Sequence, residues 1–116
     1  MKPIDHYAFG NMTIAGRAFT SDLRIFPDGR IAPNWWRRQG HLLQIEDLSD
    51  LLESRPDLLI VGTGASGTMR PAAGLQEALQ KAGIEVHFLP TAEAVQRFNA
   101  SLGGSARLAA CFHLTC

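Results

Sequence analysis

The sequence carries no excess of charge of either sign and no long hydrophobic run. Its 116 residues contain 11 lysines and arginines against 11 aspartates and glutamates, which gives a formal net charge of zero. Phosphate-binding surfaces normally show a basic excess, so we predict no nucleic-acid partner. No apolar run approaches the ~20 residues of a membrane span, and the first residues lack the apolar core of a signal peptide. We therefore expect no membrane span and a cytoplasmic protein.

Cysteine is scarce, and the histidines are scattered. Cys111 and Cys116 are offset by five positions, which points them to opposite faces of a continuing strand and predicts no internal disulfide. With His113 they offer three metal ligands, but a closed site would need a distant fourth ligand such as His87. His41 and the other histidines form no Ser–His–Asp or Cys–His grouping that can be recognised in the sequence. We therefore predict no metal site.

The most informative feature that is present is a strand that runs into a glycine loop. The apolar run Leu58–Val61 is followed by the loop Gly62–Gly67, which has the spacing G-x-G-x-x-G, and Pro71 is expected to open a helix. A buried strand that leads into a glycine turn and then a helix is how many α/β proteins build anion and ligand sites. The loop is therefore the predicted location of a site.

The second half of the chain alternates helices and strands. Helical spacing predicts helices over 45–53, 72–82 and 91–98, with Thr91 as the candidate N-cap of the last. Strands are predicted at Leu58–Val61, Ile84–Leu89 and Arg107–Phe112. Their apolar runs indicate burial on both faces, so these three strands should be neighbours in one parallel sheet.

The first third of the chain is predicted to form β-hairpins. Gly10-Asn11 is the expected turn of the first hairpin, and one strand should run from Ala18 to Phe26. The chain then returns over 30–38, where Pro33 favours an edge strand. These hairpins should extend the parallel sheet as mixed or antiparallel strands. The predicted fold is a single α/β domain over residues 1–116, with a mixed sheet, a parallel βαβαβ C-terminal half and N-terminal β-hairpins.

The chain also resembles a known family in four segments that occur in the same order. These segments are Asp22–Gly29, Asn34–Arg37, Ile60–Gly64 and Thr91–Asn99. The family is a widespread group of small α/β domains of unknown function, related to mitochondrial complex I assembly factor 3 and to an adipogenesis-associated protein. The resemblance implies a compact α/β domain and, for some relatives, an assembly or interaction role, with no established reaction. Its recurrent positions match Asp22, Arg24, Trp36, Arg37, Gly62 and Gly64.

A nucleotide cofactor does not fit the glycine loop. In a dinucleotide fingerprint the helix begins within the motif, and here it would carry Pro71 in its interior at a cost of roughly 3 kcal/mol or more. A phosphate-binding loop of the nucleotide hydrolases would need a Gly-Lys-Ser/Thr sequence, which is missing. We predict no cofactor. The loop is either a flexible turn or a set of backbone N–H groups for a carboxylate or phosphate, assisted by Thr63, Ser66, Thr68 and Arg70.

Charged and aromatic residues of the first third provide further candidates. Asp22 and Arg24 share one strand face at roughly 6.5–7 Å, either as a solvated pair or as the lining of a polar pocket. In the pocket interpretation, Arg24 reaches the glycine loop and binds an anion there. Trp35 and Trp36 point to opposite faces, so one should be buried and the other exposed beside Arg37 as an interface anchor.

These observations leave two classes of function. The first is a non-catalytic protein-interaction or assembly module with a polar pocket at the Gly62–Gly67 loop. The alternative is an enzyme or binder that acts on a small anionic metabolite at that loop. An enzyme needs a concave pocket with converging polar groups, whereas an interaction module needs an exposed apolar patch. The candidate ligand-binding residues are Asp22, Arg24, Trp36, Arg37, Gly62, Thr63, Gly64, Ser66 and Arg70.

Overall fold

The computed structural model describes residues 1–116, and five strands form its main sheet in the order β5-β4-β10-β7-β9. The strands are β5 (Ile31–Pro33), β4 (Leu23–Ile25), β10 (Leu108–His113), β7 (Leu58–Thr63) and β9 (Glu85–Leu89). The strands β10, β7 and β9 are parallel neighbours, which confirms the predicted sheet core. The antiparallel hairpin of β4 and β5 extends the sheet beyond β10, and β5 is the edge strand that Pro33 predicted.

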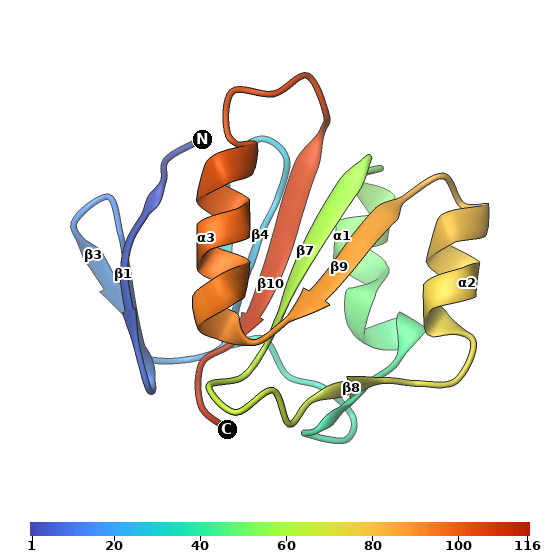
Figure 1. Cartoon of the computed structure of the whole chain (residues 1–116), viewed down its shortest axis with the longest axis horizontal. Coiled ribbons are helices and arrows are strands. Elements are labelled where there is room, and N and C mark those ends of the chain that lie inside the picture. The colour runs from blue at the N-terminus through green and yellow to red at the C-terminus, as the bar shows by residue number, and fades with distance from the viewer.

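Helices lie on both faces of the main sheet (Figure 1), and a hydrophobic core lies on each face. On one face lie α3 (Thr91–Ser101) and a separate three-stranded antiparallel sheet of β1 (Ile4–Ala8), β2 (Asn11–Ile14) and β3 (Arg17–Phe19). The other face is covered by the 3-10 turn η1 (Ile45–Leu48) with α1 (Ser49–Glu53), and by α2 (Leu75–Lys81). Strand β7 serves both cores, because Leu59 and Val61 pack on one side and Ile60 on the other, as the strand period requires. No helix is long and apolar enough to cross a membrane.

The N-terminal hairpin differs from the prediction. The predicted strand Ala18–Phe26 is divided into β3 and β4, which belong to different sheets. β1, β2 and β3 form a sheet of their own and do not extend the main one. Positive φ angles at Ala15 (51°) and Gly16 (79°) reverse the chain between β2 and β3. This arrangement lets Met12 and Phe19 pack in the core that contains Phe98 of α3, burial that a flat extension of the sheet would not provide.

The segment after the glycine loop also differs from the prediction. Pro71 does not open a helix but lies in the short strand β8 (Arg70–Pro71), which pairs in parallel with β6 (Leu42–Leu43). Proline is tolerated there because its missing N–H is not needed, while the N–H groups on either side donate to His41 O and Leu43 O. α2 begins only after Gly74, whose φ of 81° turns the chain.

The parallel strands differ in burial. β7 and β10 are buried on both faces apart from the partly exposed Leu58, as predicted. The prediction of two buried faces is wrong for β9, which is half exposed because it forms the edge of the sheet.

Candidate functional site

The carboxylate of Asp22 is the centre of a largely buried polar cluster. Asp22 immediately precedes β4, and its Oδ1 accepts the backbone N–H of Leu114 at 2.7 Å. Its Oδ2 accepts from Arg37 Nη2 at 2.8 Å and from His113 Nδ1 at 2.8 Å. Burial disfavours the charged carboxylate, but the hydrogen bonds from His113, Leu114 and Arg37 outweigh this effect and lower the pKa of Asp22. The cluster therefore holds a stable anion beside β10.

Hydrogen bonding fixes the proton positions in this cluster. A carboxylate only accepts hydrogen bonds, so His113 Nδ1 carries a proton and donates it to Asp22. Arg37 Nη2 lies 3.1 Å from the same Nδ1, and both groups donate to one carboxylate oxygen. The Arg37 guanidinium also lies 4.6 Å from the ring centroid of Trp35 and donates from Nε to Gly40 O. The side chain of His113 is buried, and its Nε2 has no hydrogen-bond partner.

The glycine loop is occupied by the segment of the same chain that follows β10. Ala65 N–H donates to Thr115 O at 2.6 Å, and Thr68 N–H donates to Cys116 O at 3.2 Å. Gly67 N–H turns inward to Gly64 O at 3.1 Å. The N–H groups that the sequence offered to an anion therefore hold the C-terminal segment against the end of β7.

Glycine is required at two loop positions, because neighbouring atoms leave no room for a side chain there. A Cβ on Gly62 would lie 2.7 Å from Phe112 Cδ1, and one on Gly64 would lie 2.4 Å from the backbone carbon of Cys116. Gly64 also has a φ of 107°, which side-chain-bearing residues rarely adopt. Their role in this structure is to let the loop and the C-terminal segment pack closely.

Thr91 has a different role from the one predicted for it. The N-cap of α3 is Pro90, and Thr91 is the first residue of the helix. Its buried hydroxyl accepts the N–H of Gly64 at 2.8 Å and donates to His113 O at 2.6 Å. Thr91 therefore links the loop to the end of β10. This contact joins segments that are distant in sequence, so no local sequence pattern predicts it.

The predicted site residues fall into two groups that adjoin at His113, which contacts Asp22 and Arg37 and lies next to Gly64. Gly62, Thr63, Gly64, Ser66 and Arg70 lie at the loop, where Thr63 is buried and Ser66 and Arg70 are exposed. The remaining four lie near β4 and the segment after β5.

Arg24 belongs to the second group. Its Nη1 donates to Asp50 of α1 at 2.6 Å, and it lines a hollow of about 540 Å³ to which no loop residue contributes. The other residues that line it are Asn34, Trp35, Trp36, Arg37, Arg38, Glu46, Asp47, Ser49 and Asp50. Buried nitrogens of two arginines, Arg24 Nε and Arg37 Nη1, have no hydrogen-bond partner.

The two tryptophans confirm the prediction of one buried and one exposed ring. Trp35 is 3% exposed and donates from Nε1 to Asp47 O at 2.9 Å. Trp36 is 84% exposed at the rim of the hollow that contains Arg24. A large aromatic ring this exposed is costly to leave in water and is typical of a contact residue.

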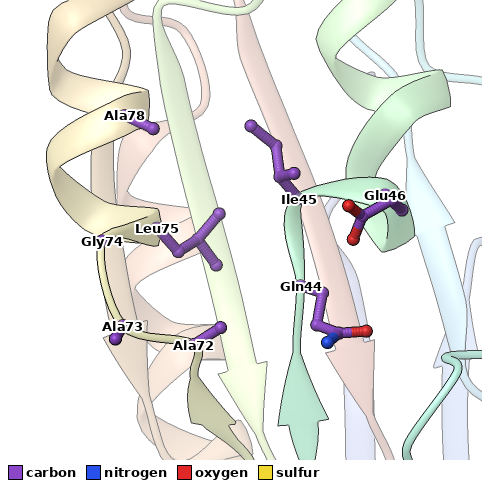
Figure 2. Close-up of a pocket in the computed structure, with 8 residues that line it drawn as sticks. All are labelled: Gln44, Ile45, Glu46, Ala72, Ala73, Gly74, Leu75 and Ala78. Atoms are coloured by element: carbon purple, nitrogen blue, oxygen red, sulfur yellow. The ribbon is translucent and has the colours of Figure 1, made fainter.

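An apolar hollow continues from this region along η1 and α2. Its volume is about 290 Å³, and Figure 2 shows Leu75 and Ala78 of α2 on one side and Ile45 and Glu46 on the other. A further hollow of about 400 Å³ shares Ile45 and Ala78 and also includes Leu52. Ile45 is 44% exposed. Ile45 is not among the predicted site residues, because it lies three positions before Leu48 and shares the spacing of the buried leucines, which predicts a core position.

The fold is that of a small mixed α/β domain. Comparison with known proteins shows the family to which it belongs. The chain belongs to the family described as a protein of unknown function (DUF498/DUF598), whose model matches residues 4–113.

Solved structures support this assignment. A conserved hypothetical protein from Pyrococcus horikoshii OT3 is 32% identical, with 97% of this chain and 98% of that chain covered and a TM-score of 0.81. A protein named MT938 is 28% identical over 100% of both chains, with a TM-score of 0.78. An outer membrane protein from Bartonella henselae is 26% identical over 99% of this chain and 96% of that chain, with a TM-score of 0.80. The α/β fold and membership of a family of small domains of unknown function are thus confirmed, whereas the relation to complex I assembly factor 3 and to the adipogenesis-associated protein stays a prediction.

Proposed function

We propose that this protein is a non-catalytic interaction module that binds an apolar segment of a partner protein. The docking face consists of Trp36, Ile45, Leu75 and Ala78, together with the hollows that they line. The observation that carries the proposal is the 84% exposure of Trp36 at a polar hollow that shares Glu46 with an apolar hollow, whose rim residue Ile45 is 44% exposed. Exposed aromatic and aliphatic side chains beside a hollow are the usual anchors of a protein interface.

The hollows of the docking face are connected. Glu46 lines both the hollow beside Trp36 and the hollow beside Leu75. Ile45 and Ala78 line that second hollow and also the third one. A partner segment that lies across these hollows would bury Trp36 and Ile45 together.

Charges around Trp36 describe the partner further. The hollow is lined by three arginines and three acids, namely Arg24, Arg37, Arg38, Glu46, Asp47 and Asp50. These charges balance, so the face has no net attraction for a polyanion or a polycation. Apolar side chains are therefore the expected source of affinity. An assembly role of the kind implied by the resemblance to complex I assembly factor 3 would use such a face.

Site-directed photocrosslinking tests the proposal. A photoreactive amino acid placed at position 36 or at position 45 should give one and the same crosslinked partner protein in cells that express the variant. Gln96, on the exposed surface of α3, is the control position and should not give this product. With the purified partner, Trp36→Ala should weaken binding by about 30-fold or more, the effect of losing about 2 kcal/mol at an interface anchor. The proposal fails if positions 36 and 45 give no product, or the same product as position 96.

A second candidate function is binding of a small anion in the hollow beside Arg24. It is favoured by the buried nitrogens Arg24 Nε and Arg37 Nη1, because buried donors normally have acceptors. Titration with phosphate and with small carboxylates should give saturable binding that Arg24→Ala weakens about 10-fold or more, the effect of losing a hydrogen bond to a charged group. Arg70→Ala is the matched control, and binding that depends on Arg70 would instead place the anion at the glycine loop.

A further inference from the structure

Three side chains of types that can bind transition metals lie close together at one end of β10. His41 precedes β6, His113 ends β10, and Cys116 lies in the C-terminal segment. Their ligand atoms all lie within 4.8 Å of one another. Cys116 Sγ lies 3.6 Å from His41 Nε2, and the imidazole rings of His41 and His113 meet edge to face with centroids 5.6 Å apart.

His113 already has the environment of a metal ligand. Its Nδ1–H donates to Asp22, which leaves the lone pair of the neutral ring on Nε2. That Nε2 is buried and has no partner. The adjoining Cδ2 atom and the backbone of Cys116 both lie next to Gly64, so this edge of the ring faces the C-terminal segment. A carboxylate that holds the far nitrogen of a histidine is the common outer-shell arrangement of histidine metal ligands.

The backbone positions of the other two residues are fixed by hydrogen bonds. His41 O accepts the N–H of Arg70 at 2.9 Å, next to the pairing of β6 with β8. Cys116 O accepts the N–H of Thr68 at 3.2 Å, and Thr115 O accepts the N–H of Ala65. The site would thus be assembled from three segments that the glycine loop and its continuation hold together.

We propose that His41, His113 and Cys116 bind a borderline-soft divalent cation of the Zn²⁺ class, with Asp22 as the positioning residue for His113. Zinc–nitrogen bonds of about 2.0–2.1 Å and a zinc–sulfur bond of about 2.3 Å place tetrahedral N and S ligands about 3.6 Å apart. This matches the 3.6 Å between His41 Nε2 and Cys116 Sγ. His41 and Cys116 are exposed and can adjust by small rotations toward the buried His113. Three protein ligands leave one tetrahedral position for water or for a partner's ligand.

This proposal departs from the sequence-based expectation of no metal. From the sequence, His87 is the candidate for the distant ligand, but in the structure it contacts Glu85 at 2.6 Å and Arg97 at 3.4 Å. His41 takes that place. It follows no ligand spacing with His113 and Cys116, because the three meet only through the packing of β6, β8 and the C-terminal segment.

Co²⁺ is the probe that tests the site, because its visible spectrum reports tetrahedral coordination and its near-ultraviolet band reports a thiolate ligand. Untagged, reduced protein should bind one equivalent of Co²⁺ with both signals, and Zn²⁺ should displace it. Cys116→Ser should remove the thiolate band, and His41→Ala should weaken binding at least 10-fold. Asp22→Asn should weaken it about 10–100-fold, the range for outer-shell partners, with the fold checked by circular dichroism.

His87→Ala is the matched control, since His87 is a partly exposed histidine outside the cluster. It should leave the Co²⁺ affinity and spectrum unchanged. The proposal is overturned if binding does not saturate, if Cys116→Ser keeps the thiolate band, or if His87→Ala weakens binding as much as His41→Ala does. These outcomes are independent of the docking face, because Trp36 and Ile45 take no part in the cluster.

Discussion

Asp22 connects more distant parts of the chain than any other side chain described above. Its two oxygens join the segment before β4 to Arg37, to His113 and to the backbone of Leu114. The Asp22 side chain is 16% exposed and that of Arg37 is 5% exposed, so these bonds are formed largely out of water. Charge-assisted hydrogen bonds are stronger than neutral ones in such surroundings. Asp22 is therefore expected to matter for stability as well as for positioning His113.

Asp22→Asn should lower the free energy of unfolding by about 3 kcal/mol, because it leaves the buried Arg37 without its counter-charge. Urea denaturation measures this change. Asp50→Asn is the matched control. Asp50 accepts from Arg24 at 2.6 Å but is 58% exposed, and exposed ion pairs contribute about 1 kcal/mol or less. Equal losses in the two variants would contradict the role given to the buried cluster.

The Asp22 cluster should also make stability depend on pH. The pKa of Asp22 in the folded protein is below its ordinary value of 3.8, so the unfolded chain takes up a proton before the folded protein does. The stabilisation is fully present above about pH 4, the range of an unperturbed aspartate, and is lost as the pH falls through the folded pKa. Urea denaturation of the wild type and Asp22→Asn between neutral and acidic pH should show their difference shrinking below about pH 4. A constant difference would count against the assignment.

At the scale of elements, the glycine loop binds the segment that follows β10 through backbone hydrogen bonds. β7 and β10 are parallel and end side by side, so the loop after β7 meets the segment after β10. The N–H groups of Ala65 and Thr68 hold that segment by its carbonyl oxygens. A loop of this kind supports anion sites in other α/β proteins, and here the ligand of its donors is the protein itself.

Gly64→Ala should destabilise the protein more than the same change at Gly83. Both glycines have positive φ, 107° and 81°, so both substitutions carry a backbone cost of about 1–2 kcal/mol. Only at Gly64 would the new Cβ meet backbone atoms, at 2.4 Å from Cys116, whereas nothing lies within 4 Å of a Cβ at Gly83. Thermal and urea unfolding of the two variants measure the difference. Equal destabilisation would show that the close packing of Cys116 against Gly64 does not constrain the loop.

At the scale of the whole molecule, the two hydrophobic cores share one sheet. One core contains 14 buried residues and the other contains 13, and β7 and β10 contribute to both. Because alternate residues of β7 and β10 belong to the two cores, unfolding of these strands disrupts both cores at once. The protein should therefore unfold as a single cooperative unit.

The Trp36→Phe variant can test this cooperativity, because it leaves buried Trp35 as the only tryptophan. Trp35 fluorescence reports the core of α1 and α2, and far-ultraviolet circular dichroism reports the whole backbone. The two urea transitions should have the same midpoint, and the midpoint by circular dichroism should match that of the wild type. Separate midpoints would mean that the two sides of the sheet unfold independently.

The sequence by itself determined the features that depend on neighbouring residues. Apolar runs such as Leu58–Val61 predicted the parallel core, because strands buried on both faces lose the alternation of polar and apolar residues. Pro33 predicted the edge strand, since it lacks a backbone donor. The opposite faces of Trp35 and Trp36 followed from the two-residue period of extended chain.

Only the tertiary structure decided what the candidate sites contain. Pro71 lies in a strand because β6, distant in sequence, offers it a partner, and this pairing overrides its preference for a helix start. The glycine loop holds Thr115 and Cys116, a contact set by the alignment of β7 with β10. His41 joins His113 only through those same pairings. Local spacing fixes which face a side chain takes, whereas the meeting of distant segments depends on how the cores are packed, and no short stretch of sequence encodes that.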